Sequence, residues 1–349
     1  MRRLPLLIAA VIAIVLASLV HGTPEPAPAQ AAPSGRAGFS PGGGFLFAPA
    51  SSQAADVRTM TSAGARWIRL DIDWSAIETS RGTYNWARTD QAVNSARAGG
   101  MSVIGLLGYT PAWARPAGTT ARRPPTNPAD MAAFASVMAK RYGSAIDVWE
   151  VWNEPNLASA WNPSPDPAAY VRLLKPVSAA LRTADPGGTV LTGGISADGD
   201  DGGAGHYPTG SWVYALYQQG AQSSFDGVSV HPYSFPKMPS QTGSAGFASI
   251  PSLRNYMVSR GDSAKGIWIT EFGSPTLPSP GVVTNDQQAA ILADAFRLVA
   301  TWPWVRTFLV YNLRDGYPTT NREQHFGLRT VGDQPKPAWT TYTGKAPAL

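Results

Sequence analysis

From Gly42 onward, short apolar runs alternate with longer stretches that have helical character. Apolar runs of this length, bounded by turn residues, are typical of buried strands, and the stretches between them are typical of helices. The pattern predicts strands at residues 44–49, 67–74, 102–109, 147–153, 189–195, 227–233, 266–272 and 307–312.

Helices are expected at residues 52–64, 86–99, 129–142, 166–184, 211–219, 247–260 and 285–300, with a closing helix within 335–343. Two of them begin with capping residues: Asp166 stands before Pro167, and Thr284 stands before Asn285 and Asp286. Strands that alternate with helices in this number predict a single α/β domain, a (β/α)8 TIM barrel.

A doubly wound parallel sheet is the structural alternative to the barrel. Its first strand would be followed by a glycine-rich turn that binds phosphate. In this chain the run Gly42-Gly43-Gly44 comes before the expected first strand instead. The pattern therefore favours the barrel.

The N-terminus has the features of an export segment. Arg2-Arg3 precedes an uncharged apolar run from Leu4 to Val20, which suits a signal peptide and is at the short limit for a membrane span. Ala29-Gln30-Ala31 fits a cleavage site but lies well beyond the run. We expect a signal peptide or N-terminal membrane anchor at 1–20, a Pro/Ala/Gly-rich linker at 21–41, and the barrel at 42–349. The protein is then secreted or attached to the cell surface, where an uncleaved anchor would tether it to the membrane.

The amino-acid composition limits the classes of partner and cofactor that we expect. The chain is 44% hydrophobic and 15% charged, which suits a sizeable core, and its net charge is +5 without any long Lys/Arg run. Nucleic acid is therefore not an expected partner. The absence of cysteine excludes disulfides and thiolate metal sites. We also expect that the protein binds no metal or cofactor and that it is a monomer. The 12 Trp, 12 Tyr and 11 Phe suit a core and also the stacking of aromatic rings on sugars.

Two strands end in glutamate. The fourth predicted strand leads into Glu154 and the seventh into Glu271. In a TIM barrel the carboxyl ends of the strands surround the active site. Two carboxylates that face each other across the barrel mouth are what glycosidic bond cleavage requires.

The segments around these glutamates carry a family resemblance. Trp152-Asn153-Glu154-Pro155-Asn156 resembles the acid/base signature of clan A glycoside hydrolases, and Thr270-Glu271-Phe272-Gly273 resembles the nucleophile segment of that clan. Within the clan the chain is most similar to family 39 and to the cellulase-like family 5. The segments 67–74, 108–114 and 231–233 support this placement. The resemblance implies a retaining mechanism, with Glu154 as general acid/base and Glu271 as nucleophile.

The same resemblance implies roles for other residues. Arg69 corresponds to an arginine beside the nucleophile, although a purely structural pair with Glu150 is an alternative. Asn153 resembles the clan residue that binds the sugar 2-hydroxyl, with a turn residue as the alternative. His231 and Tyr233 resemble a wall of the site, with Tyr233 able to donate to Glu271.

Aromatic residues give a weaker signal. Tyr109, Trp113 and Trp161 lie on or near the loops after strands three and four, where they would either stack on sugars or pack the loops. Clan members commonly carry a tryptophan at the end of strand eight, and Tyr311 is the nearest aromatic in this chain. This departure leaves the identity of the bound sugar open.

Three functions fit the sequence. The first is a retaining glycosidase that cleaves O-glycosidic, in our expectation β-linked, bonds of an extracellular carbohydrate. The second is a non-catalytic carbohydrate-binding barrel of the cell envelope, and the third is a transglycosylase with the same site. Keeping Glu154, Glu271, Asn153 and Arg69 together argues against the second, whereas the third would share all of them. The sugar, the linkage and the choice of exo or endo action stay open.

Overall fold

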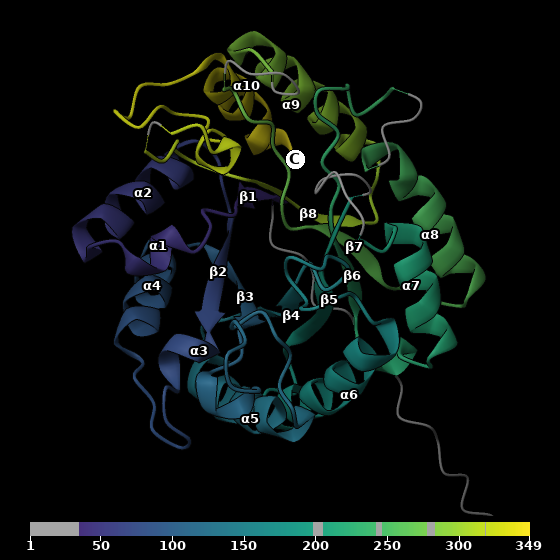
Figure 1. Ribbon diagram of the computed structural model, residues 1–349. Coiled ribbons are helices and arrows are strands. Elements are labelled where there is room, and N and C mark those ends of the chain that lie inside the picture. Colours follow the sequence, from purple (N-terminus) through teal and green to yellow (C-terminus); the bar gives the residue numbers. More distant parts are fainter. Residues whose placement is uncertain (1–34, 198–204, 242–245, 278–282, 318) are drawn as a thin grey trace, which may run out of the picture. The chain divides into compact units, whose positions relative to one another are not determined.

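Eight parallel strands close into a barrel in the computed structural model, and each strand pairs with its neighbours in chain order (Figure 1). The strands are β1 (Ala37–Phe39), β2 (Trp67–Asp73), β3 (Ser102–Gly108), β4 (Val148–Asn153), β5 (Thr189–Ser196), β6 (Gly227–His231), β7 (Gly266–Ile269) and β8 (Val305–Val310). The pairing of β1 with both β2 and β8 closes the sheet. The predicted (β/α)8 TIM barrel is confirmed.

The structure describes residues 35–197, 205–241, 246–277, 283–317 and 319–349, all of which belong to one compact unit. The predicted signal peptide or anchor at 1–20 lies outside the described residues, as does the predicted linker up to residue 34. Within the described ranges, no helix combines the length and the apolar character that a membrane crossing needs.

The first strand was predicted in the wrong place. Residues 44–49 were expected to form it, but Gly44–Phe47 forms the short helix α1. The strand is Ala37–Phe39, inside the segment predicted as a linker, so the barrel begins before residue 42. The fit at this point requires glycine, because a Cβ atom on Gly38 would collide with the carbonyl group of Trp67. Three residues are too short a run to show strand periodicity.

A ring of helices surrounds the strands (Figure 1). The longer helices match the predicted ones and are α2 (Ala50–Ser62), α4 (Ala87–Ala98), α5 (Pro128–Tyr142), α6 (Pro167–Ala184), α7 (Thr209–Gln218), α8 (Ile250–Ser259), α9 (Asn285–Ala300) and α10 (Pro337–Lys345). The helix α3 (Trp74–Ile77) was not predicted. The expected caps are present: Asp166 accepts from Ala168 and Ala169, and Thr284 forms a capping box with Gln287.

Two apolar layers hold the barrel together. The larger core lies between the strands and the helices and includes Phe134, Tyr170 and Trp212. A separate cluster is built from residues of six strands, Trp67, Ile104, Val148, Leu191, Trp268 and Leu309. Each member of this cluster is followed two positions later by a residue on the same face of its strand, because side chains alternate along a strand. On β2 and β4 these residues are the charged Arg69 and Glu150. They therefore lie next to the apolar cluster, on the side of the carboxyl ends of the strands.

Candidate active site

The end of β4 places Glu154 at the barrel mouth. Trp152 and Glu154 have left-handed backbone conformations, with φ of 77° and 47°. Such values are uncommon for residues other than glycine and tend to occur at functional sites. The backbone of Glu154 stays tied to the sheet, because its N–H donates to the Gly194 carbonyl at 2.9 Å. Gly194 has to be glycine, since a Cβ atom there would collide with His231.

Asn156 locks the loop that follows Glu154. Its side-chain amide donates to the carbonyl oxygens of Ser196 and Tyr207, at 3.0 and 2.9 Å, and accepts from the Ser196 N–H at 3.0 Å. Asn156 is fully buried. The last residue of the Trp-Asn-Glu-Pro-Asn segment is therefore structural, and it fixes the position of Glu154 against β5.

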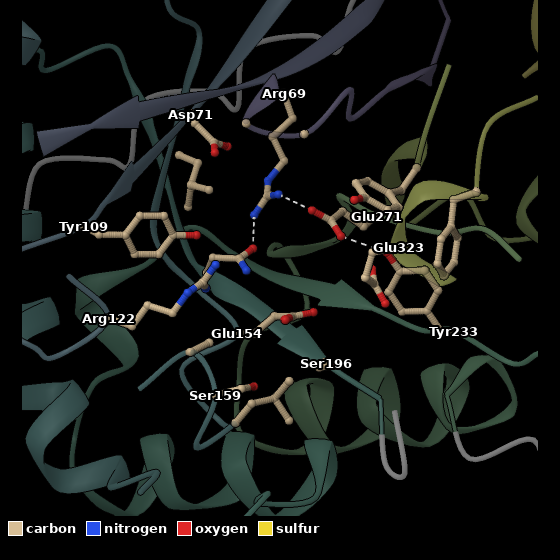
Figure 2. A pocket seen from close by; sticks show the side chains of 18 of the residues that line it. Arg69, Asp71, Tyr109, Arg122, Glu154, Ser159, Ser196, Tyr233, Glu271 and Glu323 are labelled. Carbon is tan, nitrogen blue, oxygen red and sulfur yellow. Dashed lines mark hydrogen bonds and ion pairs between the residues drawn. The ribbon is translucent and has the colours of Figure 1, made fainter. Parts of the chain in front are cut away.

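Glu271 follows β7 and receives hydrogen bonds on both oxygens (Figure 2). Arg69 Nη1 lies 2.5 Å from Oε1, and the Tyr233 hydroxyl donates to Oε2 at 2.8 Å. Ser40 adds a longer hydrogen bond of 3.4 Å. Burial, together with the charge of Glu271, raises the pKa of Tyr233 well above its ordinary value, so this hydroxyl stays protonated and donates. Glu271 is thus held in one orientation by a cation and a phenol.

Arg69 joins the nucleophile position to the barrel interior. Its Nε donates to Glu150 at 2.7 Å, and its Nη2 donates to Asn153 Oδ1 at 2.8 Å. Burial alone would lower the pKa of Arg69, but the charges of Glu150 and Glu271 outweigh burial and raise it. The two roles considered for Arg69, beside Glu271 and paired with Glu150, therefore both apply.

His231 lies between the two strand-end glutamates. Its Nδ1 is 3.0 Å from Glu154 Oε1 and 3.7 Å from Glu271 Oε2, and its Nε2 is 3.1 Å from the Thr270 hydroxyl. Burial would lower the pKa of His231, but the charge of Glu271 and the hydrogen bond to Glu154 raise it. His231 is fully buried. It was predicted as a substrate contact; in the structure it does not line the cavity and lies against both carboxylates instead.

The two carboxylates are close together. One oxygen of Glu154, one oxygen of Glu271 and a ring nitrogen of His231 all lie within 4.8 Å of one another. Retaining glycosidases hold their carboxyl groups about 5 to 5.5 Å apart, and inverting enzymes about 6.5 to 9.5 Å apart. The spacing matches the retaining class.

The same three side chains have the donor types of a metal site. Their surroundings favour another use, because the guanidinium of Arg69 lies against Glu271 and would repel a cation. The Nδ1 atom of His231 also already has a hydrogen-bond partner in Glu154. We therefore interpret the cluster as a pair of carboxylates with a bridging histidine.

Glu154, Glu271 and Arg69 line a cavity of about 500 Å³ at the mouth of the barrel (Figure 2). Of the residues that the sequence singled out, those that line it include Arg69, Asn153, Glu154, Tyr233, Glu271 and Tyr311. Tyr311, at the end of β8, contacts Phe326 edge to face with 5.3 Å between ring centroids. Tyr233 contacts the same ring at 5.7 Å. An aromatic wall thus stands beside Glu271.

Two predicted sugar-stacking residues do not line the cavity. Trp161 is 2% exposed and packs edge to face between Trp152 and Tyr170. Trp113 donates its indole N–H to the Glu78 carbonyl and packs edge to face on Trp74. Neither residue lines the cavity, so the structure favours the alternative of loop packing over sugar stacking for both. Tyr109, by contrast, lines the cavity.

Sequence reasoning missed several lining residues. Arg122 and Glu323 come from the loops after β3 and β8 and were not among the predicted site residues. Asp71 stands on β2 two positions after Arg69, so strand parity was the available signal. Figure 2 shows Asp71, Tyr109 and Arg122 on one side of the cavity and Tyr233 and Glu323 on the other.

Comparison with protein families gives one match over most of the chain. The model of the family described as cellulase, glycosyl hydrolase family 5, matches residues 30–304. The match includes both strand-end glutamates. No curated protein sequence matches the chain.

Solved structures resemble the barrel as a whole. A family 39 glycoside hydrolase from the gut symbiont Bacteroides cellulosilyticus is 26% identical, with a TM-score of 0.71 over 89% of this chain and 63% of that one. A monomeric β-xylosidase from Caulobacter crescentus is 22% identical, with a TM-score of 0.68 over 88% and 68%. An exo-β-1,4-mannosidase from an Opitutaceae bacterium is 19% identical, with a TM-score of 0.64 over 90% and 59%. The chain therefore spans less than two thirds of the first of these relatives. The last two show the fold alone.

Proposed function

Because the chain belongs to the cellulase family, glycosyl hydrolase family 5, we propose that it is a retaining glycoside hydrolase. It cleaves O-glycosidic bonds of a poly- or oligosaccharide by double displacement. The observation that carries the proposal is the spacing of Glu154 and Glu271: one oxygen of each lies within 4.8 Å of the other, while only Glu271 is paired with a guanidinium. That arrangement supplies one fixed carboxylate and one more accessible carboxyl group.

In the first step, the ionised Glu271 attacks the anomeric carbon of the bound sugar. The carboxyl proton of Glu154 passes to the glycosidic oxygen as the bond to the leaving group breaks. The products are a covalent glycosyl-enzyme and a free alcohol. The Arg69 and Tyr233 donors hold Glu271 in a single orientation, which brings the reacting atoms together without a further loss of side-chain entropy.

In the second step, Glu154 is ionised and acts as a base. It removes a proton from water, which attacks the anomeric carbon and releases Glu271. Two inversions restore the original anomeric configuration. The side chain of Glu154 is 20% exposed and that of Glu271 is 13% exposed, so the residue that must exchange protons with water is the more accessible one.

Asn153 is placed to bind the sugar beside the cleaved bond. Its amide oxygen accepts from Arg69, which leaves the NH2 group as a donor at the cavity. The amide orientation follows from this hydrogen bond, since the arginine can only donate. A donor at this point can bind the hydroxyl next to the anomeric carbon and can stabilise the charge that develops there.

The class of substrate we propose is a β-linked glycan. The solved relatives named above include a β-xylosidase and a β-mannosidase, which supports a β linkage. We also propose that the protein acts outside the cell, since residues 1–20 have the pattern of an export segment or anchor. We propose that it is a monomer, as the β-xylosidase from Caulobacter crescentus is. Cell fractionation and light scattering of the purified barrel test these two points.

A panel of aryl β-glycosides and β-linked oligosaccharides, with product anomers followed by NMR, tests the function. We expect cleavage with retention, and none by the Glu271→Gln variant prepared in parallel. Binding without cleavage by the unmutated protein would indicate a carbohydrate-binding barrel. Products longer than the substrate would indicate transglycosylation, and an inverted first product would contradict the mechanism.

A further inference from the structure

Asp71 places a carboxylate in the cavity that no side chain satisfies. It lies on β2 two positions after Arg69, is half-buried and lines the cavity. Within the described part of the chain, no group forms a hydrogen bond or ion pair with this carboxylate. Arg69, two positions earlier on the same strand, directs its hydrogen bonds to Glu150, Glu271 and Asn153 and makes none to Asp71. A carboxylate in such a position needs donors from a ligand or from water.

Two glycines keep the space around Asp71 open. A Cβ atom on Gly43 would lie 3.1 Å from Asp71 Oδ2, and a Cβ atom on Gly42 would lie 3.2 Å from Tyr311 Cε2. Both glycines line the cavity, and they come from the loop between β1 and α1. Because Gly42 and Gly43 have no side chains, they leave the space beside Asp71 and Tyr311 unfilled.

The electrostatic setting indicates what kind of ligand fits. Burial and the nearby charge of Glu271 raise the pKa of Asp71 to about 6, although Arg69 acts in the opposite direction. At neutral pH the group is thus an anion and a pure acceptor. Hydroxyl groups can donate to it, whereas a second carboxylate would be repelled.

Two of the three arginines that line the cavity are paired with carboxylates. Arg69 pairs with Glu150 and Glu271, and Arg322 pairs with Glu323 at 3.2 Å. Arg122 is exposed and lies over the Tyr109 ring, 4.9 Å from its centroid. Among the arginines of this lining, Arg122 is the one without an ion pair to any described residue, and an anionic group beside Asp71 would also be repelled by the Asp71 carboxylate.

We propose that Asp71 binds two neighbouring hydroxyl groups of a neutral sugar unit and so selects neutral sugars over uronic acids. The inference rests on the proposed function, since it concerns the sugar bound beside Glu271. The two carboxylate oxygens accept one hydroxyl each, and Gly42 and Gly43 give the sugar ring room to approach them. Asp71 is a specificity-determining residue in this account and takes no part in bond cleavage.

The kinetic test compares two aryl β-glycosides that differ only at carbon 6, a hexoside and its uronide, together with monodeoxy hexosides. We expect the unmutated protein to prefer the hexoside by at least about 100-fold in kcat/KM, because a site built for a hydroxyl strongly rejects a poor match. Asp71→Ala should lose about 100-fold on the hexoside. On the deoxy substrate that lacks the bound hydroxyl, it should lose less than fivefold. Equal losses on every substrate would indicate a structural role and would overturn the proposal.

Two glycine variants form a matched pair. Gly43→Ala adds a methyl group against Asp71 and should weaken hexoside binding at least tenfold, since the backbone φ of −61° accepts alanine. Gly44→Ala adds a methyl group that meets nothing within 4 Å and should leave binding unchanged. If Gly43→Ala binds the hexoside as tightly as Gly44→Ala does, the sugar does not approach Asp71 from this side.

Calorimetry on the Glu271→Gln variant separates the inference from the proposed function, because binding needs no turnover. Preferential binding of the neutral sugar, lost in Asp71→Ala, supports the inference even if the unmutated protein cleaves nothing, in which case the proposed function alone fails. Equal or tighter binding of the uronic acid, or binding of neither sugar, would overturn the inference.

Discussion

Arg69 Nη1 lies 2.5 Å from Glu271 Oε1, while Nε of the same guanidinium lies 2.7 Å from Glu150 Oε2. Arg69 is 3% exposed, so one buried cation links the proposed nucleophile to the charged layer inside the barrel. The forked donors of arginine suit this task, because they reach two carboxylates from one rigid plane. The position of Glu271 therefore depends on the same buried cation that pairs with Glu150.

Arg69→Lys should lower kcat by about 100-fold or more, since a lysine is a single point charge and cannot donate to both carboxylates. The variant should also lose stability, because one ammonium group cannot pair with both Glu150 and Glu271 and leaves one of these carboxylates without its cation. Steady-state kinetics and chemical denaturation measure the two effects. Arg66→Lys, at an exposed arginine just before β2, is the control and should change neither. Full activity of Arg69→Lys would show that Glu271 does not need a guanidinium that also donates to Glu150.

Glu154→Ala should cleave slowly, and its rate should depend on the acidity of the leaving group. A leaving group such as dinitrophenolate needs no proton, so the first step survives, whereas the second step lacks its base. Azide is a small anion that needs no base, so it should raise turnover and yield a β-glycosyl azide. Rates for a series of aryl glycosides, with and without azide, measure this. A rate that depends neither on the acidity of the leaving group nor on azide would show that Glu154 is not the general acid/base.

Asp71→Asn should make the protein more stable at neutral pH. Folding raises the pKa of Asp71 from 3.8 to about 6, so the folded state binds more protons than the unfolded state in this window. The contribution of Asp71 to stability is then fully present below pH 3.8 and is lost as the pH rises through 6. The neutral asparagine avoids this loss and should melt about 2 °C higher at pH 7.

The groups around Asp71 bear on this titration: Arg69 and Asp73 on the same strand, Tyr109 after β3, Glu150 on β4 and Glu271 after β7. They are the same in both proteins, so the difference in melting temperature isolates Asp71. It should shrink as the pH falls from 7 toward 4. A variant that melts below the unmutated protein at pH 7 would show that the carboxylate stabilises the fold, and that it is not held there for binding.

The strands could be predicted where the apolar run was long enough to show its length and boundaries. The strand β1 could not, because its three residues include Gly38 and carry almost no pattern of their own. They become a strand through pairing with β2 and with residues of β8 such as Leu309, far along the chain. The apolar residues of 44–47 resembled a strand and instead bury Phe45 and Leu46 in a short helix.

The catalytic candidates could be predicted because a local segment and a strand end identify each one. Glu154 and Glu271 sit where strand ends must meet in a barrel. The aromatic contacts could not be predicted, because Trp161 is turned inward by Trp152 and Tyr170, which the linear sequence does not place around it. Nor could the position of Asp71, whose lack of a side-chain partner follows from the way Arg69 directs its hydrogen bonds to Glu150, Glu271 and Asn153.

The central claim is that Glu271 becomes covalently bound to the sugar. The direct measurement uses a 2-deoxy-2-fluoro-β-glycoside with a dinitrophenyl leaving group, built on the sugar that the panel identifies. Mass spectrometry of the intact protein and of its peptides locates the adduct. We predict the addition of one fluoroglycosyl group, on the peptide that contains Glu271 and absent in Glu271→Gln. An adduct on any other residue, or hydrolysis of the parent glycoside with inversion, would contradict the account.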